Sequence, residues 1–177
     1  MTKVLLVLSS VREGRIADKI LEQVRGQFEG KDVELNIADF KTAPLPFFDH
    51  PASPATEGFS STDENVQKWT KQVEAADTVV FLTSENNFSY SAVLKNAIDW
   101  INKEWTDKPV AFIGYGWSGG AKAIAELRKL FTGFIQAKPI EAEANLTFTK
   151  MINLDGSPID EDAVKVEIDK VVAAVIS

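Results

Sequence analysis

Two serines and two arginines cluster near the start of the chain, in a segment whose residue types suit the binding of an anion. Ser9 and Ser10 end an apolar run, and Arg12 and Arg15 follow at the start of a predicted helix. Free N–H groups at a helix start favour an anion, and hydroxyl and guanidinium groups add donors suited to a phosphate. Positive side chains there oppose the helix dipole unless an anion is present. This favours phosphate binding over a simple helix cap with solvated arginines. The triphosphate-binding pattern GxxxxGK[ST] is absent.

A second candidate segment, Gly114–Gly120, matches two known patterns at once. It fits GxGxxG from its first glycine and GxSxG, the serine-hydrolase elbow, from Gly116. The hydrolase order requires a histidine after Ser118, but the one histidine of the chain, His50, precedes it. Hydrolysis is therefore disfavoured. Small residues would instead let the backbone approach a flat ligand, although a tight turn with close helix–sheet packing explains the glycines equally well.

The elements that must position these segments follow from the alternation of apolar runs with helical patterns. Predicted strands cover residues 4–8, 33–37, 77–83 and 109–115, with a fifth from about residue 139. Predicted helices begin near residues 15, 61, 93, 120 and 157. Such alternation is typical of βαβ units around a parallel sheet. We therefore predict one α/β domain over residues 1–177, with a doubly wound, five-stranded parallel sheet in the flavodoxin-like or the dinucleotide-binding strand order.

Local signals predict several element boundaries. Ser61 and Glu64 have capping-box spacing at the start of a helix. Ser157 followed by Pro158 is typical of a helix cap with proline at the first helical position. Residues 41–60 hold four prolines and form a long loop of a kind that is often functional. Four aromatic side chains are expected in the core: Trp100, Trp105, Phe131 and Phe134.

Three loops with unusual chemistry, at residues 9–15, 84–91 and 115–120, each follow a predicted strand. Ligands of doubly wound sheets bind outside the carboxyl ends of the strands. Because the carboxyl ends of parallel strands meet at one edge of the sheet, we expect the three loops to converge on one ligand.

Composition narrows the classes of function. The chain has no cysteine and one histidine, which excludes disulfides, thiolate metal sites and a cysteine nucleophile and makes a zinc site improbable. Its 26 acidic and 19 basic residues give a net charge of −7, which disfavours binding to nucleic acid or to an acidic membrane surface. The apolar run of residues 4–8 is too short for a signal peptide or a membrane span. We expect a cytoplasmic location.

The middle loop and the helix after it resemble a family motif. Residues 84–100 read SENNFSYSAVLKNAIDW, which is similar to PEYNxSxPxxLKNAIDW of the NADPH-dependent FMN reductase family. Residues 9–15 resemble the phosphate loop of that family, YGWSGGAKA resembles its YGxxSGGARA segment, and PLPFFD in the long loop is similar to its LPLYDED-type stretch. The resemblance spans roughly residues 3 to 130.

The resemblance implies a flavodoxin-like fold, bound FMN, and a homodimer or dimer of dimers. The implied activity is ping-pong reduction of flavins, quinones or related small acceptors by NADH or NADPH. Hydride transfer is the chemistry of the cofactor, so no catalytic side chain and no metal are implied. Ser10, Arg12 and Arg15 would hold the FMN phosphate. The full implied set of cofactor-binding residues is Ser9, Ser10, Arg12, Arg15, Ile16, Ser84, Glu85, Asn86, Asn87, Gly116, Trp117, Ser118 and Gly119.

The ring-binding loops depart from the family pattern at four points. Ser91 stands where a proline is common, and the glycine loop is one residue shorter and carries Trp117. Ser84 replaces the usual proline, and Asn86 replaces the usual aromatic residue. We expect Trp117 to take over the role of that aromatic residue. The alternative is that Trp117 packs against a partner subunit and leaves the ring site without an aromatic residue.

Three other functions remain open at this point. One is a flavodoxin-type electron carrier that takes no hydride from a nicotinamide, and another is a flavin-free interaction domain of the same fold. The third is a dehydrogenase with the GxGxxG segment on its dinucleotide and Glu141 on the ribose. Glu141 lies 27 residues past Gly114, farther than the usual spacing of about 20.

Overall fold

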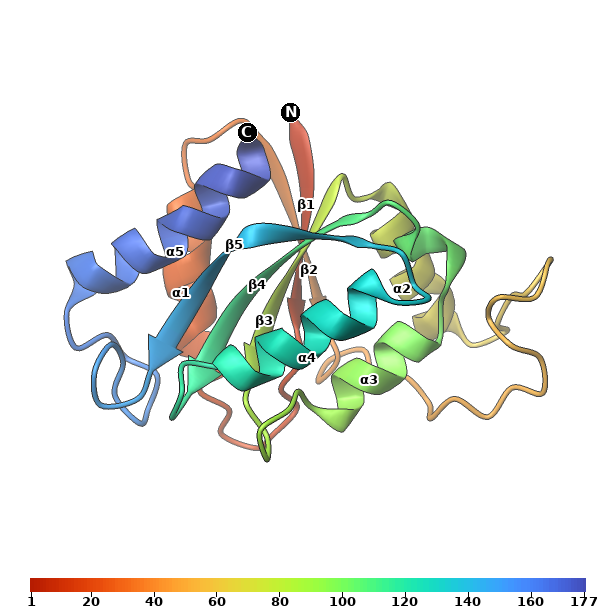
Figure 1. Cartoon of the computed structure of the whole chain (residues 1–177), viewed down its shortest axis with the longest axis horizontal. Coiled ribbons are helices and arrows are strands. Elements are labelled where there is room, and N and C mark those ends of the chain that lie inside the picture. The colour runs from red at the N-terminus through yellow and green to blue at the C-terminus, as the bar shows by residue number, and fades with distance from the viewer.

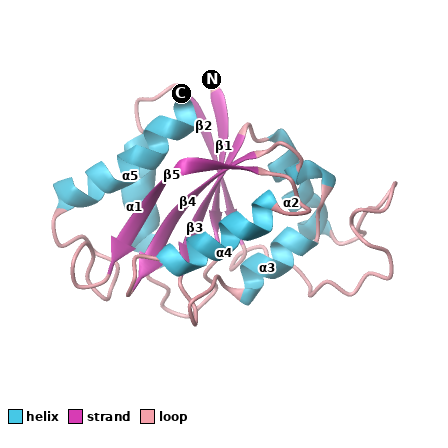
Figure 2. Cartoon of the chain, viewed as in Figure 1, coloured by secondary structure: helices cyan, strands magenta, loops and turns pink.

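Five parallel strands form the centre of the computed structural model, which describes all residues from Met1 to Ser177. The strands are β1 (Thr2–Leu8), β2 (Val33–Asp39), β3 (Thr78–Ser84), β4 (Pro109–Gly116) and β5 (Lys138–Thr147). They pair in the order β2-β1-β3-β4-β5 and run in the same direction (Figures 1 and 2). This is the flavodoxin-like order rather than the dinucleotide-binding one. It confirms the predicted fold class.

Five α-helices cover the sheet on both faces. They are α1 (Ala17–Phe28), α2 (Glu64–Ala75), α3 (Ala92–Asp99), α4 (Ala121–Thr132) and α5 (Glu161–Ile176), with a short 3₁₀ turn at Lys103–Trp105. Helices α1 and α5 lie together on one face, and α2, α3 and α4 cover the other (Figure 1). Each loop that leaves a strand tip therefore emerges between two helical layers.

The buried strands show why both layers form. Successive side chains of a strand point to opposite faces, so the apolar run of β1 divides between two cores. Val4, Leu6 and Leu8 pack with α1 and α5, whereas Leu5 and Val7 pack with α2, α3 and α4. A strand covered on both faces needs such a continuous apolar run.

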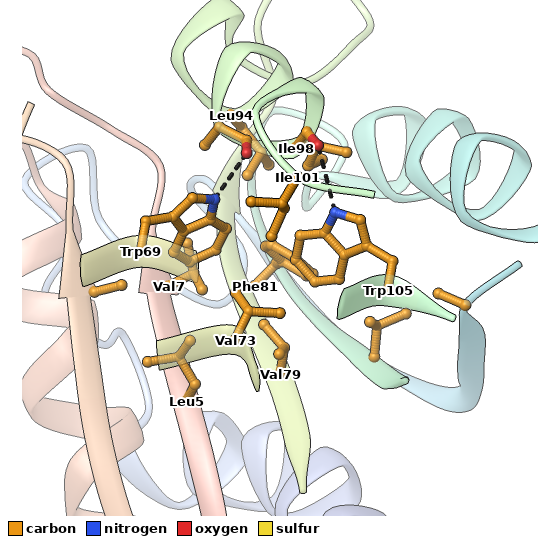
Figure 3. Packing of buried hydrophobic residues seen from close by; sticks show 14 of the residues in the cluster. Leu5, Val7, Trp69, Val73, Val79, Phe81, Leu94, Ile98, Ile101 and Trp105 are labelled. Carbon is orange, nitrogen blue, oxygen red and sulfur yellow. Dashed lines mark hydrogen bonds between the residues drawn. The ribbon is translucent and has the colours of Figure 1, made fainter. Parts of the chain in front are cut away.

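Two tryptophans organise the core on the α2–α4 face. Trp69 and Trp105 are almost fully buried, and each indole N–H donates to a backbone carbonyl near the end of α3. The acceptors are Ala97 O at 2.8 Å and Ile98 O at 3.3 Å (Figure 3). A buried indole N–H without a partner would cost free energy. These bonds therefore fix how α3 lies against α2.

The long loop between β2 and α2 is held along α3. The Asn96 amide and the Trp100 indole both donate to the carbonyl of Pro46, at 2.8 and 2.7 Å, and Asn96 accepts from the backbone of Phe48. Beyond this attachment the loop extends away from the body of the domain (Figure 1, orange to yellow). The predicted loop is confirmed.

Two predicted helix caps are wrong. The N-cap of α2 is Asp63, whose carboxylate accepts from Val66 N at 3.0 Å. The hydroxyl of Ser61, the predicted cap, accepts from Asp63 N instead. The cap of α5 is Asp160, not Ser157. Ser157 is held by the carboxylate of Asp155, so the chain turns once more before the helix begins.

One predicted core residue is also wrong. Phe134 is 82% exposed, whereas Trp105 and Phe131 are fully buried and Trp100 nearly so. Phe134 follows Gly133, where α4 has ended, and so lies off the buried stripe of that helix.

We expect Gly114→Ala to destabilise the protein by about 1–3 kcal/mol, the usual cost of overpacking. A Cβ at this position would lie 2.7 Å from Gly119 O and 2.9 Å from Gly120 Cα, which are backbone atoms that cannot move aside freely. Gly26→Ala is the control: it lies inside α1 with no atom within 4 Å of the added Cβ, and it should stabilise by up to about 1 kcal/mol. Urea unfolding of both variants measures this, and equal stabilities would contradict close packing at Gly114.

Candidate functional site

A cavity of about 350 Å³ lies at the carboxyl ends of the strands, where the three predicted loops converge. Its lining residues are Ser10, Arg12, Glu13, Gly14, Arg15, Ile16, Ser84, Glu85, Asn86, Tyr115, Gly116, Phe148 and Leu154. Larger hollows lie elsewhere, beside α2 and beneath the long loop. The cavity at the strand ends is the one that combines cationic, hydroxyl and backbone donors at the edge where ligands of this fold bind.

The two arginines of the first loop differ in their partners. The Arg15 side chain is only 5% exposed and forms a two-pronged ion pair with Asp39, both contacts at 2.6 Å. Arg15 also donates to Ser10 O and pairs with Asp18. The Arg12 guanidinium is exposed and has no hydrogen bond or ion pair within the chain. Arg12 is therefore the cation available to an anion, while Arg15 holds the loop in shape.

Charge and burial act together on this ion pair. The carboxylate of Asp39 raises the pKa of Arg15 well above its ordinary value. Burial alone would raise the pKa of Asp39, but the Arg15 side chain and the backbone N–H of Lys41 lower it below its ordinary value. Both side chains are thus held in their charged forms.

The serines of the first loop are both buried, in different roles. The Ser9 hydroxyl donates to Leu82 O, and Ser9 O accepts from Ser91, the residue that caps α3. Ser10 lines the cavity beside Tyr115, a phenol that is only 4% exposed. Burial raises the pKa of Tyr115, and the Ser10 and Ser84 hydroxyls beside it act in the opposite direction. The floor of the cavity therefore presents a neutral phenol among hydroxyls.

Glu85 ties the second loop to the third. Its backbone N–H donates to Tyr115 O, and its carboxylate accepts from the Ser118 hydroxyl and from Lys122 N at the start of α4. A carboxylate at a helix N-terminus is stabilised by the helix dipole. A Cβ on Gly116 would lie 3.2 Å from the Cβ of Glu85. The absence of a side chain at Gly116 therefore lets the two loops meet.

The second loop is a tight hairpin. Asn86 and Ser89 exchange backbone hydrogen bonds of 2.7 and 2.9 Å, with Asn87 and Phe88 between them at φ of 48° and 64°. The Ser84 hydroxyl donates to the side-chain oxygen of Asn86. Phe88 is exposed, and the ammonium group of Lys122 lies 3.4 Å from the centre of its ring.

Most of the predicted site residues lie around the cavity. Ser10, Arg12, Arg15, Ile16, Ser84, Glu85, Asn86 and Gly116 line it, whereas Ser9, Asn87, Trp117, Ser118 and Gly119 lie next to it without lining it. The roles of all thirteen toward a cofactor stay predictions. The predicted set lacks five lining residues and the partner residue Asp39. Of the five, Glu13, Gly14 and Tyr115 lie within the loops predicted to converge, whereas Phe148 and Leu154 lie outside them. Tyr115, Phe148 and Asp39 end or follow strands at this same edge, and that rule could have found them.

Comparison with known proteins agrees with this geometry. Residues 2–150 match the family model described as NADPH-dependent FMN reductase. The NAD(P)H-dependent FMN reductase LOT6 of Saccharomyces cerevisiae is 30% identical over 141 residues, which is 74% of either chain. An FMN-dependent NADPH-azoreductase of Staphylococcus haemolyticus is 34% identical over 67% of this chain and 61% of its own. The solved structure of FerB, a flavoenzyme NAD(P)H:(acceptor) oxidoreductase of Paracoccus denitrificans, superposes with a TM-score of 0.76 at 26% identity, covering 99% of this chain and 96% of FerB.

The flavodoxin-like sheet with a polar cavity at the carboxyl ends of β1, β3 and β4 defines a nucleotide-cofactor-binding α/β protein. With the match over residues 2–150, the chain belongs to the NADPH-dependent FMN reductase family. It is accordingly an oxidoreductase that uses FMN with NADPH or NADH as the electron donor. No helix of the structure has the length and apolar character needed to cross a bilayer.

Arg15→Ala should lower the free energy of unfolding of the FMN-free protein by about 2 kcal/mol, because it leaves the Asp39 carboxylate without its partner. Arg12→Ala, at the exposed arginine of the same loop, should leave that free energy within about 0.5 kcal/mol of the parent. Denaturant unfolding without cofactor measures both. Equal stability of the two variants would show that the Arg15–Asp39 pair does not support the loop.

The same pair predicts a pH dependence. Because the pKa of Asp39 is lower in the folded protein than in the unfolded chain, its contribution to stability is present above the unfolded pKa of about 4 and is lost as the pH falls through the folded pKa. Asp39→Asn should therefore be less stable than the parent at pH 7, with the difference shrinking below about pH 4. Unfolding curves at several pH values measure the difference; one that stays constant down to pH 2 contradicts the assignment.

Proposed function

We propose that the cavity at the strand ends holds FMN, with its phosphate on the loop of residues 9–16 and its ring beside residues 84–87 and 116–119. The observation that carries this proposal is the unpaired Arg12 guanidinium, which lines the cavity with the buried Ser10 in the loop that leads into α1. The chemistry of these donors fits a phosphate: a cation, a hydroxyl and the free N–H groups of a helix start. Arg15 acts on this loop indirectly, through Asp39.

The ring side of the cavity fits a flat ligand with polar edges. Gly116 carries no side chain where the second and third loops meet, so the backbone is open to close approach. Asn86 and Glu85 supply polar groups whose orientation is fixed by Ser84 and Ser118. Bound FMN supplies hydride and electron transfer, so the residues of the chain bind, orient and exclude water.

We further propose that NAD(P)H and a small acceptor, such as a quinone, a flavin or an azo compound, bind in turn at the same face of the site. Two similarities support this range of acceptors. One is to the azoreductase, and the other is to an NADPH:quinone oxidoreductase of Arabidopsis thaliana that is 39% identical over 37% of this chain. We propose a homodimer or dimer of dimers in the cytoplasm. Association of subunits would cover the exposed side chains of Phe47, Phe88 and Trp117.

The experiment that tests this function mixes the FMN-loaded protein with NADPH without oxygen. We expect NADPH to reduce the flavin, so that its visible absorbance is lost after mixing. The absorbance should return when a quinone is added after the NADPH has been consumed. A flavin that stays oxidised in NADPH and NADH, yet accepts electrons from dithionite, would instead indicate an electron carrier.

Arg12→Ala should weaken FMN binding by about tenfold or more, since one charged hydrogen bond is worth about 1.5–3 kcal/mol. Arg25→Ala is the matched control, because Arg25 is an exposed arginine in the last turn of α1, at the other end of the helix from the Arg12 loop. Fluorescence titration of the FMN-free proteins measures both affinities. If Arg12→Ala binds FMN as tightly as Arg25→Ala, the phosphate does not lie on Arg12.

A further inference from the structure

Phe148, the first residue after β5, contributes an aromatic side chain to the wall of the cavity. Most lining residues are polar, charged or glycine; the apolar and aromatic ones are Ile16, Tyr115, Phe148 and Leu154. Tyr115 is only 4% exposed and forms part of the floor. Phe148 is half-buried and packs partly against the core on the α1–α5 face, so of the two aromatic residues it is the more accessible from the cavity.

The backbone fixes Phe148 against the third loop. Its N–H donates to Gly116 O at 2.9 Å, the carbonyl that also accepts from Gly119 N. The next residue, Thr149, has φ of 61°, and its backbone N–H donates to the carbonyl of Ile152. The side chain of Ile152 is buried in the core. The segment therefore turns sharply just after Phe148, with one end held by β4 and the other by the core.

The remainder of this segment is held against α1. Lys19 pairs with Asp155 at 2.5 Å, and a Cβ on Gly156 would lie 2.8 Å from Ile16 O. Gly156 has φ of 85°, a conformation that favours glycine. The wall that carries Phe148 is thus connected to the same helix start that carries the proposed phosphate loop.

Trp117 contacts Phe148 rather than the cavity. The two rings meet edge to face, with centroids 5.6 Å apart and planes at 83°, and Trp117 is 69% exposed. Such a contact limits the orientations that the Phe148 ring can take. Trp117 therefore affects the cavity only by limiting the orientation of the Phe148 ring.

We propose that Phe148 is the residue whose aromatic face contacts the isoalloxazine ring, and that Trp117 is a positioning residue that orients Phe148. This proposal rests on the proposed FMN site. It accounts for the polar Asn86: the aromatic surface comes from the end of β5 and is braced by the third loop.

The test measures the affinity of FMN-free variants for FMN and for riboflavin by fluorescence titration. Phe148→Ala should weaken binding of both ligands by about three- to tenfold and to the same extent, because the ring is common to both. Phe148→Tyr should retain the affinity, and Phe148→Leu, which keeps an apolar side chain of similar reach, should lose part of it. Trp117→Ala should give a smaller loss than Phe148→Ala, and the double variant should lose less than the product of the two.

Phe134→Ala is the control, since Phe134 is an exposed phenylalanine beyond the far end of α4. Thermal unfolding without flavin checks that each variant is folded. Parent protein that binds FMN, together with Phe148→Ala and Phe148→Leu variants that bind both flavins as tightly, overturns this inference and leaves the proposed function standing. Parent protein that binds neither flavin overturns both.

Discussion

The structure depends on one constraint: the parallel sheet is covered by helices on both faces, so its three central strands, β1, β3 and β4, must be apolar along most of their length. Four serine or threonine residues are buried, and three of them, Ser9, Ser10 and Thr83, lie at the carboxyl ends of β1 and β3. Backbone groups with no strand partner also accumulate at those ends, beside helix starts that favour anions. A ligand with a phosphate and a flat ring therefore has one natural place on this domain, the cavity at that edge.

Within this cavity, residues that shape the site are separate from those free to bind. Arg15 is used to join the first loop to the end of β2 through Asp39, which leaves Arg12 as the available cation. Glu85 joins the second loop to the third through Ser118 in the same manner. Because these contacts fix the loops, their backbone is arranged before any cofactor arrives, which lowers the entropic cost of binding.

The periodicity of the sequence was sufficient to predict the elements, the single domain and the parallel sheet, because buried strands and amphipathic helices leave strong patterns. Periodicity alone left two strand orders open, and the resemblance to the family motif favoured the flavodoxin-like one. What the sequence could not supply was pairing between distant residues. The predicted phosphate ligand Arg15 is paired with Asp39, the caps of α2 and α5 are Asp63 and Asp160, and Phe148 lies outside the segments that carry the family resemblance. Each of these depends on which residues the fold brings together.

The central claim is that this edge of the sheet binds FMN through its phosphate as well as its ring. Titration of the cofactor-free protein with FMN and with riboflavin, at the same salt concentration, tests the claim most directly. We predict saturable binding of one flavin per chain, with FMN held at least tenfold more tightly than riboflavin, because the charged hydrogen bond from Arg12 is available only to the phosphate. Equal affinities for the two flavins would contradict the account.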